Sequence, residues 1–164
     1  MAAPRSILTT SLLALALAAG AFAAWAVAQG VRPATDRLIP YTDEAAVAAG
    51  AEIYAEHCAA CHGADLEGQV PEWRKRGPDG LMPAPPHDES GHTWHHPDPI
   101  LIDITTRGTA AVVGQGYRSA MPGFGDVLDP EQIRAVLAYI KSTWPEDIIE
   151  THDRINADAA AAAR

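Results

Sequence analysis

The feature that most constrains this chain is the pentapeptide CAACH at residues 58–62, in which two thiols stand close together and an imidazole follows at once. Thiols at this spacing can form thioethers with the two vinyl groups on one edge of a haem, and the adjoining histidine can then offer a ring nitrogen to the iron. The motif therefore predicts one covalent haem c joined to Cys58 and Cys61, with His62 as an axial ligand.

Other uses of the two cysteines fit the sequence less well. A structural zinc site needs four ligands, normally with a second cysteine pair, and this chain has only 2 cysteines. A thioredoxin-like redox pair needs a βαβ context, which the sequence does not suggest. A disulfide closing so short a loop would constrain the chain little and would leave His62 unexplained.

An apolar segment precedes the motif. Residues 7–28 carry no charge and follow a single basic residue, Arg5, and the segment ends in a small-residue Ala-Val-Ala pattern. This layout predicts an export signal cleaved near Ala28, or a membrane anchor, since the run is long enough to cross a bilayer. Under either reading the rest of the chain works outside the cytoplasm, so we divide it as 1–28 signal peptide or anchor, 29–42 tether, 43–145 folded domain and 146–164 flexible, Ala-rich tail.

The patterning of the folded domain is helical, and we expect an all-α fold. Apolar residues recur at helical spacing from about 42 to 58 and again from 130 to 144, where Asp129 caps the start and Pro145 ends the helix. A shorter helix is expected from Pro99 to about residue 106, with Asp98 as its N-cap. Residues 63–97 are rich in Gly, Pro and His and should form mostly loop.

A second axial ligand is expected from a methionine, because a haem iron that only transfers electrons is usually held from both sides. Met82 and Met121 both precede a proline, so their immediate neighbours do not separate them. Met121 lies in a Gly-rich loop just before the last predicted helix, which can fold across the second face of the haem. We therefore favour Met121 and keep Met82 as the alternative distal ligand.

Three runs together resemble the class I, bacterial monohaem branch of the cytochrome c family. They are GAEIYAEHCAACHG, then MPGFGD, then QIRAVLAYIKSTWP, and the similarity covers about residues 45–145. The resemblance implies a small cytochrome c fold of three to five helices, wrapped with long loops around one covalent haem. It also implies that the domain lies on the periplasmic side of a bacterial inner membrane, anchored by residues 7–28 or soluble after cleavage.

The same resemblance assigns roles to individual residues. Met121 would be the distal ligand, and Gly50 and Tyr139 would form the pair at which the first and last helices cross. The carbonyl of Pro85 or of Pro86 would accept the Nδ1 proton of His62, which would fix the orientation of the imidazole.

The segment GHTWHHPD departs from a minimal member of that family. Together with the preceding His87 it brings four histidines within ten residues: His87, His92, His95 and His96. The simpler reading is a structural loop at the haem edge, with Trp94 donating its N–H to a haem propionate. The alternative is a second metal site, most plausibly copper, at His92, His95 and His96.

The formal net charge of −9 argues against a nucleic-acid partner, which needs basic surface. The expected function is one-electron transfer between redox proteins outside the cytoplasm, without catalysis by this chain itself. Two other hypotheses remain open: a haem-bearing subunit of a larger oxidoreductase, and a copper-handling or redox-sensing cytochrome that uses the loop 87–96.

Overall fold

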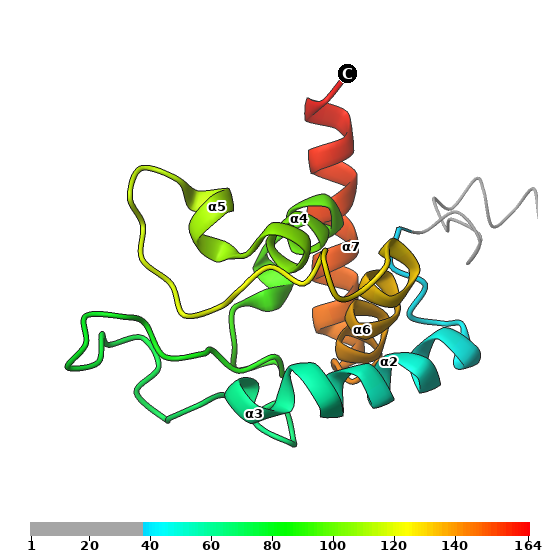
Figure 1. Cartoon of the computed structure of the whole chain (residues 1–164). Helices are drawn as coiled ribbons and strands as arrows, with labels where there is room; N and C mark the ends of the chain where they lie inside the picture. The colour runs from blue at the N-terminus through cyan, green and yellow to red at the C-terminus, as the bar shows by residue number, and fades with distance from the viewer. Residues whose placement is uncertain (1–37) are drawn as a thin grey trace, which may run out of the picture. The chain divides into compact units, whose positions relative to one another are not determined.

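The computed structural model describes residues 38–164, and this part of the chain is helical and contains no β-strand (Figure 1). The predicted signal or anchor segment and most of the predicted tether lie outside the described residues. Within residues 38–164, no helix is both long enough and apolar enough to span a membrane.

Two helices form the centre of the domain, α2 (Glu44–His57) and α6 (Pro130–Ser142). The Asp43 carboxylate caps α2 by accepting from the backbone N–H groups of residues 45 and 46. The predicted capping box of α6 is present, with Asp129 accepting from the backbone of Gln132 and the Gln132 side chain accepting from the backbone of Asp129. Both helices therefore begin directly after their capping residues, Asp43 and Asp129.

The crossing of α2 and α6 depends on a missing side chain. A Cβ placed on Gly50 would lie 2.0 Å from the carbonyl oxygen of Ala135 and 3.0 Å from the Cβ of Tyr139. No side chain fits in that space, so glycine is what allows the two backbones to approach. Gly50 and Tyr139 thus meet at the helix crossing, as the family resemblance implied.

The remaining short elements carry the chain around this pair. After α2 come α3 (Ala59–His62), a long loop, the 3₁₀ turn η2 (Thr93–His95), α4 (Asp98–Arg107) and α5 (Thr109–Val113). Asp98 is the first residue of α4 rather than its N-cap, which is Pro97. The carbonyl of Pro97 accepts from the backbone N–H of Leu101, and the backbone N–H of Asp98 donates to the side chain of Asn156, from a distant helix, at 2.7 Å.

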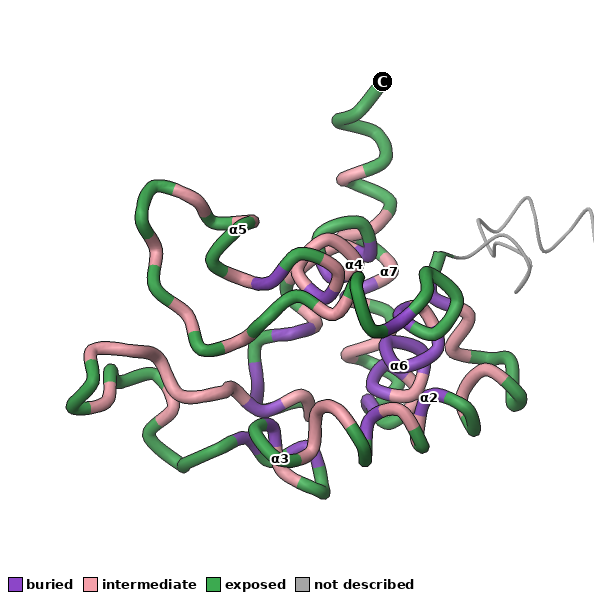
Figure 2. The backbone as a smooth tube through the Cα atoms, in the orientation of Figure 1, coloured by how far each residue is buried: buried purple, intermediate pink, exposed green. Residues whose placement is uncertain are grey.

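The core lies where α6 faces α2 and α4, as the buried residues in Figure 2 indicate. Its buried apolar members include Ile39, Tyr54, Leu66, Leu101, Leu128, Ile133, Val136, Leu137, Ile140 and Trp144. Ile39 is only 1% exposed. The last residues of the predicted tether therefore contribute to the core. Local sequence could not predict this, because the apolar partners of Ile39 are distant in the chain.

The C-terminal segment also differs from the prediction of a flexible tail. It forms α7 (Glu146–Ala162), whose Ile148 and Ile149 pack against the core. Further along α7, His152 is fully buried and its Nε2 lies 2.9 Å from the carbonyl oxygen of His96. The final turns of the helix are largely exposed (Figure 2).

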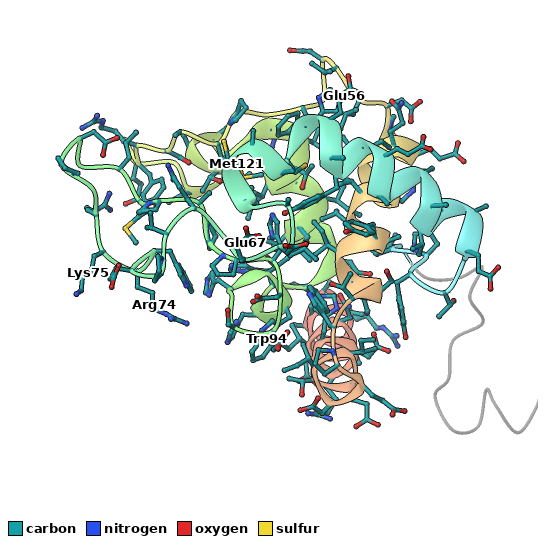
Figure 3. The ribbon with its side chains drawn as sticks, turned by 90° about the horizontal axis from the view of Figure 1, so that it is seen from below. Glu56, Glu67, Arg74, Lys75, Trp94 and Met121 are labelled. Carbon is teal, nitrogen blue, oxygen red and sulfur yellow. The ribbon has the colours of Figure 1, made fainter. Side chains whose placement is uncertain are left out.

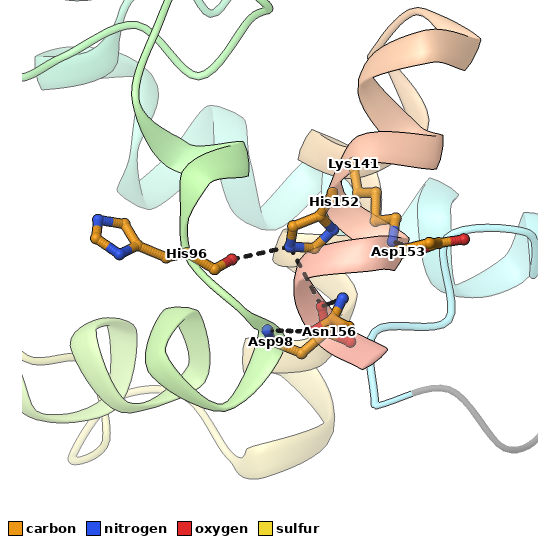
Figure 4. A network of polar contacts seen from close by, with 6 residues as sticks. All are labelled: His96, Asp98, Lys141, His152, Asp153 and Asn156. Atoms are coloured by element: carbon orange, nitrogen blue, oxygen red, sulfur yellow. Dashed lines mark hydrogen bonds and ion pairs between the residues drawn. The ribbon is translucent and has the colours of Figure 1, made fainter. Parts of the chain in front are cut away.

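A network of polar contacts fixes α7 to the rest of the domain (Figure 4). The amide group of Asn156 bonds Asp98 twice, accepting from its backbone N–H and donating to its carboxylate at 2.9 Å. The ammonium group of Lys141, on α6, is buried and pairs with Asp153 of α7. These partners are far apart in sequence, which is why a local reading of a polar, Ala-rich segment did not predict the docking.

Candidate functional site

The two thiols lie at the junction of α2 and α3. Cys58 is the C-cap of α2, and the backbone N–H of His62 bonds the carbonyl oxygen of Cys58 at 2.9 Å, which closes one helical turn over the motif. Cys58 is half-buried, Cys61 is exposed, and neither forms a disulfide. Burial, followed by the neighbouring Cys61, raises the pKa of Cys58 to about 11, so this thiol is protonated at neutral pH.

The imidazole of His62 is buried and oriented by a hydrogen bond. Its Nδ1 lies 2.9 Å from the carbonyl oxygen of Pro85, so of the two candidate prolines it is Pro85 that makes this contact. A carbonyl can only accept, so Nδ1 carries the proton and Nε2 keeps the lone pair that a metal needs. Burial lowers the pKa of His62, with the Pro85 contact opposing the shift, and the ring is therefore neutral at pH 7.

The loop after the motif is held in place by hydrogen bonds and by close packing of its backbone. The hydroxyl of Tyr54, from the buried face of α2, donates to the carbonyl oxygen of Gly63 at 2.9 Å. The backbone N–H of Gly68 donates to the carbonyl of His62 at 2.7 Å. Pro86 is buried and lies close to glycines of the same loop. A Cβ on Gly91 would lie 1.9 Å from the carbonyl oxygen of Pro86. The carbonyl that orients His62 is thus part of a fixed loop.

Met121 lies on the loop between α5 and α6. Its side chain is half-buried, and its sulfur accepts a hydrogen bond from the hydroxyl of Thr109 at 3.4 Å. The loop then runs against the end of α4, where the N–H of Phe124 bonds the carbonyl of Thr105 at 2.9 Å. Figure 3 shows Met121 among the ribbons of the domain, whereas Arg74 and Lys75 lie at its periphery.

The alternative distal ligand, Met82, lies on the other loop and is also half-buried. It stands three residues before Pro85, and the Pro85 carbonyl approaches His62 from the Nδ1 side of the ring. The choice of Met121 over Met82 as the distal ligand therefore stays a prediction from the sequence.

The histidine-rich segment does not form a ready metal site. The ring centroid of His92 lies 5.1 Å from that of His95 and 4.8 Å from that of His96. Even so, among residues 38–164 no group of three or more His, Cys, Asp or Glu side chains is arranged to hold a metal ion. The proposed copper site thus remains a prediction without geometric support.

Trp94 has a hydrogen-bond partner within its own loop. Its indole N–H donates to the carbonyl oxygen of Glu89 at 3.0 Å, and its contact with a haem propionate stays a prediction. The ring also stacks on His95, with centroids 3.7 Å apart. The Glu89 carbonyl is within reach of the Trp94 indole N–H because the chain turns back on itself between residues 88 and 95.

One neighbour of His62 was not foreseen in that role. The ring of His87 stacks on His62, with centroids 4.0 Å apart and an angle of 19° between the planes. The sequence analysis grouped His87 with the other histidines of its loop. Its position two residues after Pro85, whose carbonyl contacts His62, was the one signal that it lies near His62.

Taken together, the residues present fit a haem c. Two free thiols and a buried imidazole are close together on one helical turn, and the Nδ1 of that imidazole is occupied by a carbonyl. The half-buried thioether of Met121 is carried on a separate loop. If His62 and Met121 both held the iron, no position would stay open for a substrate, and such a site would suit electron transfer.

Comparison with known proteins agrees with this description. The family model for cytochrome c matches residues 47–144. The subunit FixP of a cbb3-type cytochrome c oxidase from Sinorhizobium medicae (strain WSM419) is 34% identical over 104 residues, which cover 63% of this chain and 32% of the relative. The subunit CcoP of a cbb3-type cytochrome c oxidase from Azospirillum sp. (strain B510) is 31% identical over 98 residues, covering 60% of this chain and 29% of that protein.

A FixP subunit from Bradyrhizobium sp. (strain ORS 278) is similar to the same degree, at 34% identity over 95 residues. The matched segments cover 27% to 32% of the relatives, so the similarity is to about a third of each of them. No solved structure matches the chain significantly. Helix α7 begins at Glu146 and lies beyond the family match.

Proposed function

Since the chain belongs to the cytochrome c family, we propose that residues 43–145 carry one haem c and act as a one-electron carrier outside the cytoplasm. In this proposal Cys58 and Cys61 form the thioethers, and His62 and Met121 are the axial ligands. The observation that carries it is the Pro85 carbonyl at 2.9 Å from Nδ1 of His62, because this contact leaves Nε2 for the iron. The haem supplies an iron that alternates between two oxidation states.

The protein contributes ligand geometry and exclusion of water. The His62 ring is buried and hydrogen-bonded, and such a bond makes an imidazole a better ligand. The soft sulfur of Met121 would favour the reduced iron and so raise the reduction potential. No proton transfer and no substrate site are required.

The ligand assignment is tested by absorption spectroscopy of protein expressed with haem-c maturation. Met121→Ala should convert the haem from low-spin to high-spin and allow rapid binding of carbon monoxide. Met82→Ala is the matched control, since it removes a methionine that also precedes a proline, and it should leave the spectrum unchanged. If Met82→Ala alone opened the iron, the assignment of the two methionines would be reversed.

A docking surface for the redox partner is supported by the distribution of charge. Although the chain has a net charge of −9, four exposed cationic residues gather on the two loops that carry Pro85 and Met121. The loops meet there, because the Arg118 guanidinium donates to the carbonyl of Asp79 at 3.3 Å. Within the first loop, the guanidinium of Arg76 donates to the carbonyl of Gly80 at 2.8 Å. We call these residues the cationic rim: Arg74, Lys75, Arg76 and Arg118. They suit a partner with an acidic docking surface.

The cationic rim is tested by the rate of electron transfer to small charged oxidants. The anion hexacyanoferrate(III) should oxidise the protein faster at low ionic strength than at high ionic strength, whereas the cation tris(phenanthroline)cobalt(III) should not. The double change Arg74→Glu with Lys75→Glu should abolish this preference. Arg154→Glu with Arg164→Glu, on α7, makes the same change in net charge and should have little effect. Equal effects of the two pairs would contradict a local docking surface.

A second candidate function is that of a haem-bearing subunit in an oxidase complex. It is favoured by the three relatives, each of which is a subunit of a cbb3-type cytochrome c oxidase. Residues 7–28 would then anchor the chain beside its partner. Purification of the full chain from detergent-solubilised membranes separates the two functions: stable co-elution with an oxidase favours the subunit, and elution alone favours the mobile carrier.

A further inference from the structure

The two faces and edges of the His62 ring are constrained differently. Its edge is fixed by the hydrogen bond from Nδ1 to the Pro85 carbonyl, and one face is covered by the ring of His87 at a centroid distance of 4.0 Å. The hydrogen bond sets where Nε2 points. It also restrains the plane of the ring, because Nδ1 lies off the axis through Nε2, and a parallel ring stacked on the face of His62 opposes any remaining rotation.

His87 is itself held at three points. Its backbone N–H donates to the carbonyl of Leu66 at 2.7 Å, and its carbonyl accepts from the indole N–H of Trp144 at 2.7 Å. Its Nδ1 lies 2.6 Å from the hydroxyl of Thr93, which is buried. A side chain fixed at both backbone and ring is a rigid support, unlike the exposed imidazoles of His92 and His95 on the same segment.

We propose that His87 is a positioning residue that, together with the Pro85 hydrogen bond, sets the rotation of the His62 ring about the axis through Nε2. The proposal rests on the proposed function in one respect, namely that His62 binds the iron. The plane of an axial imidazole determines how its π orbital overlaps the iron d orbitals, and hence how unpaired spin is distributed over an oxidised haem. His87 would thereby set the electronic asymmetry of the haem from outside the ligand set.

The test uses the haem-loaded full chain and proton NMR of its oxidised form, in which the paramagnetically shifted haem methyl resonances report the plane of the axial imidazole. His87→Ala should redistribute the methyl shifts, because the ring of His62 loses its stacked neighbour. His87→Phe restores a flat ring without its hydrogen bond to Thr93 and should return the shifts toward those of the wild type. His95→Ala removes an exposed imidazole stacked on Trp94 and should change nothing.

The outcomes are separable from those of the proposed function. A low-spin wild-type spectrum, lost in His62→Ala, establishes that His62 binds the iron before any His87 variant is compared. If His87→Ala then folds with unchanged methyl shifts, His87 does not position the ring and the proposal is overturned. It is equally overturned if His87→Phe and His87→Ala give the same altered shifts, since a stacked ring would then have no influence.

Discussion

The close approach of α2 and α6 at Gly50 leads to a sharp prediction for stability. A Cβ at this position would lie 2.0 Å from the backbone oxygen of Ala135, far inside van der Waals contact. The obstacle is backbone within a helix rather than the end of a flexible side chain, so Gly50→Ala must push the helices apart. Overpacking of this kind costs about 1–3 kcal/mol, and we place this site at the upper end.

Helix propensity acts in the opposite direction. Alanine is more favourable than glycine inside a helix by about 1 kcal/mol. The expected net loss for Gly50→Ala is therefore about 2 kcal/mol. With a guanidinium dependence of roughly 4 kcal/mol per molar, the midpoint of unfolding should fall by about 0.5 M.

The assay is guanidinium denaturation of the haem-loaded protein, followed by far-ultraviolet circular dichroism. Ala49→Gly is the matched control, because Ala49 is an exposed residue of the same helix. It should lose about 1 kcal/mol through propensity alone. If Gly50→Ala were instead more stable than the wild type by that amount, propensity alone would operate at Gly50 and the close crossing would be refuted.

Three predictions concern the docking of α7. Burial, and then the charge of Lys141, lower the pKa of His152 below 6.5, whereas Asp98 acts to raise it. Below pH 6.5 the unfolded chain therefore binds a proton at this residue that the native state does not bind. The free energy of unfolding should fall there by at most about 1.4 kcal/mol per pH unit for this group. Denaturation at pH 7.5 and 5.5 should show a smaller loss in His152→Gln, and an equal loss would exclude His152 as a source. Asp153→Ala removes the carboxylate that faces the buried ammonium group of Lys141. Because this carboxylate is partly exposed, the free energy of unfolding should fall by about 1–2 kcal/mol, measured by urea denaturation at low salt. An unchanged midpoint would mean that the ion pair does not stabilise the protein. Asn156→Ala removes two hydrogen bonds to Asp98 and should lower the free energy of unfolding by about 1–3 kcal/mol, measured in the same way, and a neutral result would show that α7 docks without them.

Features with local sequence signals could be predicted, and long-range contacts could not. The start of α6 was foreseen at Asp129 because its cap and its partner Gln132 are three residues apart. The family resemblance limited the hydrogen-bond acceptor for Nδ1 of His62 to two neighbouring prolines, Pro85 and Pro86. The fold of the loop places the carbonyl of Pro85 at this position. Asp98, by contrast, begins α4 instead of capping it, and its contact with Asn156, 58 residues away, has no local signal.

The same distinction applies within the candidate site. The attachment motif is contiguous, so its three members could be read directly from the sequence. The stack of His87 on His62 joins a loop residue to the last residue of α3, and it depends on where Trp144 and Thr93 hold His87. The docking of α7 was missed because its one buried residue, His152, is polar, and polar side chains in an Ala-rich segment normally indicate exposure.

The central claim is that a haem is covalently bound at Cys58 and Cys61 with His62 on the iron. The most direct measurement is the intact mass of the denatured chain after expression with haem-c maturation, together with its reduced absorption spectrum. The account predicts the mass of one haem added to the polypeptide and sharp low-spin haem-c bands, with the full attachment lost when both cysteines are replaced by alanine. A polypeptide mass without added haem, from cells that mature another c-type cytochrome normally, would contradict it.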